Sequence, residues 1–262
     1  MSGFDPAGCC ALVTGASAGI GWEFARQLTG RAGSLVLVAR RREKLEQLRD
    51  ELTKRDPNLN VHLRATDLSK PDEVHALTDW LTEEKIAIDL LVNNAGLGDQ
   101  GEFATTDRHR LTEMLAVNVA SLTELTHALL PSMIERRRGA ILNVSSSAGF
   151  FPIPRIAVYA ATKAYVTSFS EALRTEVRGY GITVSALCPG PVETEFAEVA
   201  RRAGKRYRTS PKFTHVSVEA VVQAGLNAVE RDKPIVIPGF AMKIAMFLVR
   251  LTPMAILRLV SR

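Results

Sequence analysis

Short apolar runs alternate with helical segments along almost the whole chain, and this alternation is the feature that most constrains the fold. Continuous apolar strands are typical of a parallel sheet that is covered on both faces. The expected strands are Cys9–Thr14, Ser34–Ala39, Val61–Ala65, Asp89–Asn93, Ala140–Ser145, Ile182–Cys188 and Pro234–Ile237. The expected helices are Ile20–Arg31, Arg41–Lys54, Pro71–Glu84, Asp107–Leu130, Val158–Arg178 and Val218–Glu230. The pattern predicts an α/β protein with a doubly wound parallel sheet, whose ligand crevice lies at the carboxyl ends of the strands.

Composition excludes several other classes of protein. Of the 262 residues, 46% are apolar and 23% are charged, which is typical of a globular protein and not of a disordered or fibrous one. Three cysteines without CxxC spacing exclude a disulfide scaffold and a zinc ribbon, and they favour a reducing, cytoplasmic location. Aromatic residues make up only 6%, and basic residues are not spread over a docking face, so we expect no nucleic-acid partner.

The chain start and the hydropathy pattern predict neither a secretion signal nor a membrane span. Met1–Gly8 has no basic residue before the first apolar run, and it contains an acidic residue, Asp5. No stretch of 18 apolar residues occurs. We therefore expect one catalytic domain over residues 1–239, including a substrate lid at 195–215, followed by a helical tail at 240–262.

A glycine-rich turn, TGASAGIG at Thr14–Gly21, follows the first expected strand and opens the first helix. Glycine permits a tight turn and a close approach of the backbone to a ligand. The N-terminus of the helix offers free N–H groups to a pyrophosphate. The alternative is a plain strand-to-helix turn, and the spacing differs from the common GxGxxG fingerprint. The position of the turn at the first crossover favours nucleotide binding.

Three arginines, Arg40 to Arg42, follow the second strand and indicate which dinucleotide is bound. An acidic residue at this position would hold the ribose 2′-hydroxyl of NAD, whereas an arginine suits the 2′-phosphate of NADP. We therefore expect NADP(H) rather than NAD(H), bound by Arg40 and Arg41, with Ser17 donating a second hydrogen bond. The alternative is that the arginines are the solvated start of a helix.

Tyr159 and Lys163 are four residues apart at the start of an expected helix, so they share one helical face. An ammonium about 4 Å from the phenol stabilises the phenolate by about 4 kcal/mol, enough to bring a tyrosine pKa near 10 towards neutrality. The pair would then act as a general acid and base. The alternative is a surface tyrosine and lysine on an amphipathic helix.

Together these motifs identify the chain as resembling the single-domain short-chain dehydrogenase/reductase family, whose fold is of the Rossmann type. The resemblance covers about residues 9–238, and the order and spacing of the motifs are highly specific. The motifs are Thr14–Gly21, Asp67-Leu68, Asn93–Gly96, Asn118, Ser145-Ser146, Tyr159 with Lys163, and Pro189–Thr194.

The resemblance implies four catalytic residues. Tyr159 would protonate the nascent alkoxide, and Lys163 would lower the pKa of Tyr159 and bind the nicotinamide ribose. The catalytic serine of the family lies thirteen residues before its tyrosine, which selects Ser146, and its hydroxyl would polarise the carbonyl. Asn118 would hold a water that relays protons, although capping or a polar role in the core is the alternative.

The same resemblance, with the glycine turn and the arginines, implies a set of cofactor contacts. Asp67 would accept from the adenine amine, or cap the helix that follows. Asn94 and Ala95 would line the adenine ribose, and Val192 and Thr194 would hydrogen-bond the carboxamide. The full expected set is Gly15, Ser17, Gly19, Ile20, Gly21, Arg40, Arg41, Asp67, Leu68, Asn94, Ala95, Gly96, Tyr159, Lys163, Pro189, Gly190, Val192 and Thr194.

Two segments bear on the substrate. The lid is rich in Arg and Lys over Glu195–Phe213, which indicates either attraction of an anionic substrate tail or a solvated surface. The tail, 240–262, has four basic residues and no acidic one, and on an ideal helix Lys243, Arg250 and Arg258 share one face. Pro253 should kink or divide that helix. Met242, Met246, Phe247, Leu248, Leu251 and Ile256 should cover much of the rest. The tail is either an interfacial helix at a membrane or a segment packed on the domain or a second subunit.

The sequence therefore predicts an NADP(H)-dependent oxidoreductase acting on a carbonyl or a secondary alcohol. The expected substrate is a lipophilic aldehyde, ketone or 3-oxoacyl compound. From the resemblance we also expect a homodimer or homotetramer. The alternative is a nucleotide-binding regulator or membrane-associated scaffold that keeps the fold without turnover.

Overall fold

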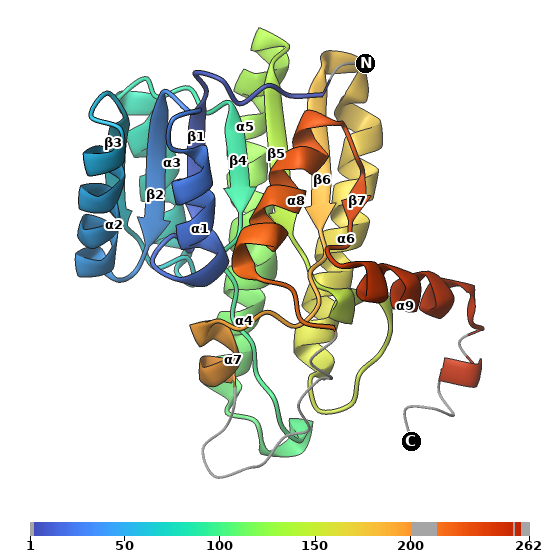
Figure 1. Cartoon of the computed structure of the whole chain (residues 1–262). Coiled ribbons are helices and arrows are strands. Elements are labelled where there is room, and N and C mark those ends of the chain that lie inside the picture. The colour runs from blue at the N-terminus through green and yellow to red at the C-terminus, as the bar shows by residue number, and fades with distance from the viewer. Residues whose placement is uncertain (1–2, 201–213, 254, 258–262) are drawn as a thin grey trace.

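A computed structural model provides the structure of the chain and describes residues 3–200, 214–253 and 255–257. Its centre is one sheet of seven parallel strands in the order β3-β2-β1-β4-β5-β6-β7 (Figure 1). The strands are β1 (Cys10–Thr14), β2 (Ser34–Ala39), β3 (Asn60–Ala65), β4 (Leu90–Asn93), β5 (Gly139–Val144), β6 (Ile182–Leu187) and β7 (Ile235–Val236). The predicted doubly wound parallel sheet is confirmed, and each strand begins and ends within one residue of its expected bounds.

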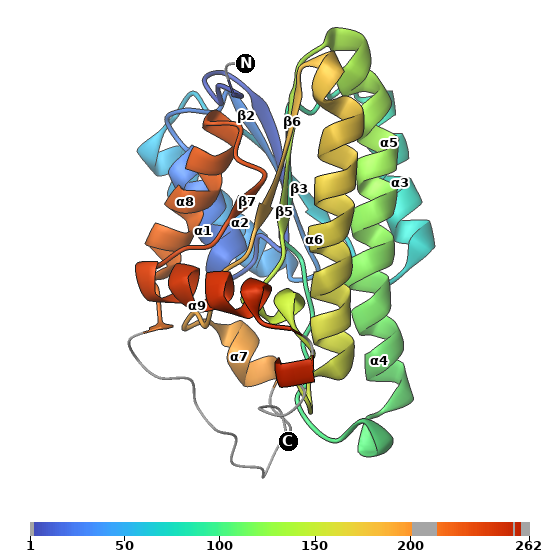
Figure 2. The same cartoon turned by 90° about the vertical axis from the view of Figure 1, so that its right-hand side faces the viewer.

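Helices cover both faces of the sheet (Figure 2). One face carries α1 (Gly19–Leu28), α2 (Arg42–Arg55) and α8 (Val218–Glu230). The other face carries α3 (Pro71–Glu83), α5 (Ser121–Arg136) and α6 (Ala157–Val177). Shorter elements gather at the carboxyl ends of the strands: η1 (Phe103–Thr105), α4 (Arg108–Leu115), η2 (Ala116–Ala120), η3 (Ser147–Phe150), α7 (Glu195–Ala200) and α9 (Phe240–Leu251); η4 (Arg178–Tyr180) follows α6.

The five strands β1, β2, β4, β5 and β6 contribute alternate side chains to two separate hydrophobic cores, because successive residues of a strand point to opposite faces. On β1, Ala11 and Val13 pack with α1, α2 and α8, whereas Leu12 packs with α3, α5 and α6. On β2, Leu35 and Leu37 join the first core. All of these side chains are fully buried, which explains why the strands are apolar throughout.

The long helix expected over Asp107–Leu130 is wrong in its continuity and at its end. It is divided into α4, one π-helical turn at η2, and α5, which continues through Pro131 to Arg136. A proline normally interrupts a helix because it has no N–H to donate. Pro131 lies on the exposed side, where water can satisfy the carbonyl that loses its donor, and the buried Met133 anchors the following turn.

The strand order fixes where a ligand can bind. β1 lies between β2 and β4, so connections leave β1 and β4 towards opposite sides of the sheet. In open α/β sheets the crevice lies at this reversal, outside the carboxyl ends of the strands. The glycine turn after β1 and the Asn94–Gly96 segment after β4 meet there.

Candidate active site

Two glycines of the first turn are required by close packing. Gly15 has φ +66°, a left-handed conformation, and a Cβ on it would lie 2.9 Å from the Cα of Ala95. A Cβ on Gly21 would lie 2.3 Å from the carbonyl oxygen of Gly15. A side chain at either position would force the turns after β1 and β4 apart, or push the turn away from α1.

The start of α1 offers unsatisfied donors next to this turn. Its N-cap residue, Ala18, is extended and makes no side-chain hydrogen bond to the first turn of the helix. The first N–H groups of a helix have no partner within the helix, and they attract phosphate. The glycine cradle and the uncapped helix therefore fit the pyrophosphate of a dinucleotide.

Thr14 and Asn94 hold the two turns together. The Thr14 hydroxyl donates to the Val92 carbonyl and accepts from the N–H groups of Asn94 and Ala95, at 2.9 and 3.0 Å. The Asn94 amide donates to the carbonyl oxygen of Thr14 at 2.8 Å. Asn94 thus braces the cradle, and Thr14 is a supporting residue that the sequence reasoning missed. A threonine ending a buried strand before a glycine turn was the only available signal.

The arginines after β2 lie around the glycine turn. The Arg41 guanidinium contacts the hydroxyl of Ser17 at 3.3 Å and the carboxylate of Glu195 at 3.1 Å. Arg40 pairs loosely with Glu113 at 3.8 Å. Arg42 turns away and pairs with Glu46 within α2. The structure therefore groups Ser17 and Arg41, with Arg40 beside them, as the residues that could hold a 2′-phosphate.

Asp67 closes the turn after β3 and does not cap α3. Its carboxylate accepts from the N–H and the hydroxyl of Ser69, at 3.0 and 2.8 Å, whereas the N-cap position belongs to Lys70. Burial raises the pKa of Asp67, but the bonds from Ser69 and the charge of Arg40 outweigh it and hold the pKa below its usual value. An ionised Asp67 beside a buried Leu68 suits an adenine amine.

Tyr159 and Lys163 project from the first turns of α6, and the Lys163 ammonium lies 5.8 Å from the centre of the Tyr159 ring. Burial raises the pKa of Tyr159, and a hydrogen bond with Ser146 partly offsets this. Burial also lowers the pKa of Lys163 to about 8. The lysine donates to the carbonyl of Val144 at 2.8 Å and not to the phenol. The direct contact between the Lys163 ammonium and the phenol oxygen, which would lower the pKa of Tyr159, is therefore not made in this arrangement.

The three serines after β5 have different partners. Ser145 is buried and donates to the carbonyl of Lys163 at 2.8 Å, which fixes the start of α6 against β5. The N–H of Ser147 donates to Pro189 at 2.9 Å. Ser146 is the one that contacts Tyr159, and its hydroxyl also accepts from the N–H of Ala148 at 3.1 Å. The geometry thus favours Ser146 as the serine that acts with the tyrosine.

Asn118 lies in the π-helical turn between α4 and α5 and is 1% exposed. Its amide oxygen accepts from the N–H of Leu97 at 2.7 Å, and its amide nitrogen donates to Leu97 O and to the Thr162 hydroxyl. Both N–H donors are used, so a water held by this side chain would have to donate to its oxygen. The side chain joins the segment after β4 to the helix of Tyr159. Gly96 lies between Asn118 and Lys163, and a Cβ on this glycine would be 3.4 Å from Lys163 Nζ.

The turn after β6 completes the crevice. A Cβ on Gly190 would lie 2.7 Å from Met242 Cε of α9. Val192, with Ile20 of α1, packs against the core. Thr194 lies against the glycine turn, since a Cβ on Gly19 would be 3.2 Å from its methyl carbon.

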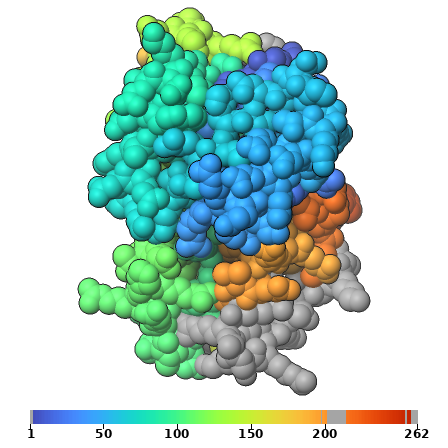
Figure 3. Space-filling view, turned by 90° about the vertical axis from the view of Figure 1, so that its left-hand side faces the viewer, coloured from blue at the N-terminus to red at the C-terminus, as the bar shows by residue number. Residues whose placement is uncertain are grey.

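Helix α7 lies over the catalytic side chains. Phe196 packs on Tyr159 with ring centres 5.7 Å apart. In the space-filling view α7, in orange, fills the space between the start of α2 and the green α4 segment (Figure 3). Arg110 of α4 pairs with the buried carboxylate of Asp99 at 3.0 Å and donates to the carbonyl of Val199 at the end of α7. The sequence reasoning missed this clamp, which depends on contacts between distant segments.

Little space remains beside Tyr159 with α7 in this position. The cavity next to it, which Phe103 and Met114 also line, has a volume of about 30 Å³, room for about one water. A cavity of this volume is too small for a carbonyl substrate. The basic lid residues Arg201, Arg202, Lys205, Arg206, Arg208 and Lys212 lie outside the described residues.

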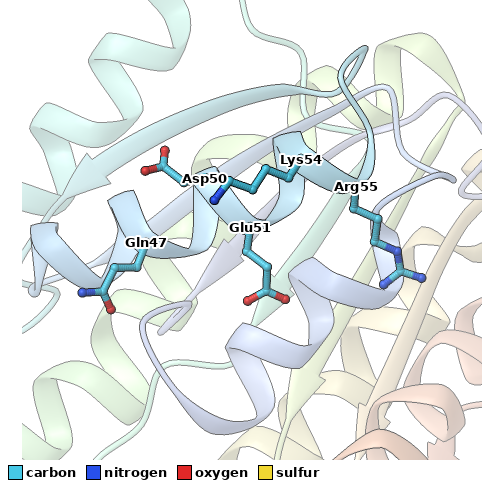
Figure 4. A pocket seen from close by; sticks show the side chains of 5 residues that line it. All are labelled: Gln47, Asp50, Glu51, Lys54 and Arg55. Carbon is cyan, nitrogen blue, oxygen red and sulfur yellow. The ribbon is translucent and has the colours of Figure 1, made fainter.

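A second depression is remote from this site. It lies on α2 and is lined by Gln47, Asp50, Glu51, Lys54 and Arg55 (Figure 4). These are charged or polar side chains of a solvated helix, and Glu51 pairs with Arg26 at 2.7 Å. The depression faces away from the carboxyl ends of the strands, and we assign it no function.

Comparisons with known proteins agree with this geometry. The family model described as short chain dehydrogenase matches residues 9–204. A sulfoacetaldehyde reductase of Chromohalobacter salexigens is 43% identical over 192 residues, covering 72% of this chain and 75% of that protein. A very-long-chain 3-oxoacyl-CoA reductase of Aspergillus terreus is 32% identical, covering 82% and 68%.

Solved structures share the whole fold. A short-chain dehydrogenase from Sphingobium yanoikuyae in complex with NADPH is 30% identical, with a TM-score of 0.80 over 93% of this chain and 94% of that one. A short-chain dehydrogenase/reductase from Burkholderia phymatum in complex with NAD is 25% identical, also with a TM-score of 0.80, covering 94% of each chain. Similar structures thus contain either dinucleotide.

Proposed function

The chain belongs to the short-chain dehydrogenase family of oxidoreductases, and from that premise we propose that it is an NADPH-dependent reductase of lipophilic aldehydes, ketones or 3-oxoacyl compounds. The observation that carries the proposal is the meeting of Tyr159, Ser146 and Lys163 beside a glycine cradle that excludes any side chain. The sulfoacetaldehyde reductase and the very-long-chain 3-oxoacyl-CoA reductase among the relatives support a carbonyl substrate.

The protein residues would handle the proton and the carbonyl oxygen. When bound, the dinucleotide supplies a hydride to the carbonyl carbon. Tyr159 would then donate its phenolic proton to the carbonyl oxygen as negative charge develops there, and Ser146 would donate a hydrogen bond to the same oxygen. Lys163, still cationic at neutral pH with a pKa of about 8, would stabilise the phenolate that remains.

The preference for NADPH rests on the arginines after β2. Arg41 lies against Ser17, and Arg40 is half exposed beside Asp67, so neither is committed to the core. A 2′-phosphate would compete with Glu195 for Arg41, and it forms a stronger charge-assisted contact than an exposed ion pair does.

The proposed substrate class follows from the walls of the site. Phe196 of α7 covers Tyr159, and the buried Met242 of α9 lies against Gly190 in the turn after β6. These side chains present apolar surface around the reacting groups, which favours a substrate with an apolar body.

We also propose that the protein forms a homodimer or homotetramer through α4, α5 and α6. α5 and α6 lie side by side on one face of the molecule (Figure 2). Leu115 and Tyr165 on this face are 49% and 38% exposed, and they would be covered in such an assembly. Sedimentation velocity of the wild type and of Tyr165→Ser tests this proposal.

The activity itself is tested by NADPH oxidation with a panel of carbonyl compounds that vary in chain length within each chemical class. The panel includes short and long aldehydes, ketones and 3-oxoacyl thioesters. We expect kcat/KM to rise with chain length because each added methylene buries more apolar surface. Turnover restricted to the shortest members would contradict the proposed substrate class. Absence of turnover despite tight NADPH binding would favour the alternative, a nucleotide-binding regulator that keeps the fold without turnover.

A further inference from the structure

Helix α9 has an apolar outer face that no described element covers. Five large apolar side chains lie on this face, 46% to 79% exposed: Phe240, Ile244, Phe247, Leu248 and Leu251. At about 100° per residue they fall within an arc of roughly 100°, so they form one continuous surface, here called the outer stripe. Single exposed apolar residues are ordinary, whereas a contiguous group of this kind marks an interaction surface.

The opposite side of α9 fixes the helix to the active-site end of the domain. Met242 and Met246 are buried, and Met242 reaches Gly190 in the turn after β6. Arg250 lies over the ring of Phe150 in η3, with its guanidinium carbon 5.6 Å from the ring centre. Figures 1 and 2 show α9 crossing the carboxyl end of the sheet beside β7, with its outer side away from the body. The methionines and the larger apolar residues, expected to cover much of the helix outside its cationic face, occupy two sides of it.

Charge borders the outer stripe. Lys243 is exposed and, at the same helical spacing, lies along one border of the stripe, whereas the guanidinium of the exposed Arg250 lies over Phe150. Residues 240–262 contain four basic residues and no acidic one. The surface thus combines apolar side chains that avoid water with cations that have no acidic partner on the same segment.

We propose that the outer stripe docks in the interfacial region of a membrane with anionic lipids, with Lys243 against the headgroups. A helix lying in the membrane plane buries its apolar face about 5–10 Å deep, a depth that the side chains of one helix can fill. None of the described helices is long and apolar enough to cross a bilayer, which is consistent with docking on one leaflet. A second copy of the chain fits less well, because its α9 would bring further cations and no carboxylate.

Docking of this kind would place the active-site end of the domain at the membrane. The inner side of α9 contacts the turn after β6 and η3, and both adjoin Ser146. A lipophilic carbonyl compound dissolved in the bilayer would then reach the site without crossing water. Substrate delivery rests on the proposed function, whereas membrane binding does not.

The test is co-sedimentation of the full chain with vesicles. One set contains phosphatidylcholine alone, and in the other a third of the lipid is phosphatidylserine. We expect about tenfold stronger binding to the anionic vesicles, since each cation near the surface adds attraction. The double variant Phe247→Ser, Leu251→Ser should lose binding, and Lys243→Gln should weaken it on anionic vesicles only. Tyr180→Ser removes a similarly exposed ring from η4 and should bind as the wild type does.

Two results would overturn the proposal. One is failure of the wild type to sediment with anionic vesicles. The other is retained binding by the Phe247→Ser, Leu251→Ser variant. A third result would also overturn it: the wild type does not bind vesicles and sediments as a dimer, whereas the variant sediments as a monomer. The stripe would then be a subunit interface. NADPH oxidation with a short soluble aldehyde, measured without vesicles, reports separately on the proposed function.

Discussion

Replacing Arg41 or Arg40 by alanine should lower the affinity for NADPH without a comparable loss for NADH. Two unit charges 4 Å apart interact by about 1 kcal/mol in water and about 4 kcal/mol at an effective dielectric constant of 20. The two side chains are 46% and 56% exposed, which places them towards the lower value. Arg41 also gives up its exposed pair with Glu195, worth at most about 1 kcal/mol. We therefore expect about 1–2 kcal/mol from each arginine, or about 5- to 30-fold in the NADPH dissociation constant.

The assay is equilibrium titration of each protein with NADPH and NADH at one fixed ionic strength, followed by cofactor fluorescence. Arg42→Ala is the matched control, because its side chain is 70% exposed and pairs with Glu46 inside α2. The reasoning is refuted if the wild type binds both cofactors equally. It is also refuted if Arg42→Ala weakens NADPH binding as much as Arg41→Ala does.

Two further predictions concern groups buried at the site. Lys163 loses its proton near pH 8 in the folded protein and near pH 10.5 when unfolded, so between these values the unfolded state binds more protons and stability rises with pH. The free energy of unfolding of the cofactor-free protein, measured in urea, should therefore rise by about 2 kcal/mol between about pH 7.5 and 9.5 relative to that of Lys163→Met. An equal pH dependence in both proteins would contradict the burial of the charge. Asn118→Ala should lower the free energy of unfolding by about 3 kcal/mol, because it leaves the partly buried N–H and carbonyl of Leu97 and the buried hydroxyl of Thr162 without this partner. A change below about 1 kcal/mol would show that water replaces the amide.

The sheet could be predicted from the sequence because its strands are buried on both faces, and such strands read as unbroken apolar runs. Local signals also located the glycine turn and the Tyr159–Lys163 pair. The helix expected to end at Leu130 continues through Pro131, because propensity says nothing of whether the lost hydrogen bond faces water. The π-helical turn at Asn118 could not be foreseen either, since it depends on contacts with Leu97 and Thr162 that are distant in sequence.

The supporting contacts of the site were hidden for the same reason. Thr14 joins β1 to the segment after β4, and Arg110 reaches the end of α7, so neither role has a local signature. The pKa of Tyr159 depends on how deeply the phenol is buried and on the direction in which Lys163 points. Helical spacing alone predicts that Tyr159 and Lys163 share one helical face, but it does not predict the direction in which the Lys163 side chain points.

Helix α9 shows how far periodicity alone can reach. Spacing predicted an amphipathic segment interrupted near Pro253, and α9 does end at Leu251. Spacing could not show that Met242 and Met246 would face the domain, because this requires the position of the turn after β6. Once that turn is placed, the apolar residues on the other side are covered by none of the elements that the structure describes.

The central claim is that Tyr159 supplies the proton for carbonyl reduction, and the most direct test compares the wild type with Tyr159→Phe. Turnover of NADPH with the best carbonyl substrate is measured beside the NADPH dissociation constant of each protein. The ring of phenylalanine keeps the contact with Phe196 and removes only the hydroxyl that meets Ser146. The account predicts that turnover is abolished while the dissociation constant stays within about twofold. Turnover that persists in Tyr159→Phe with intact NADPH binding would contradict it.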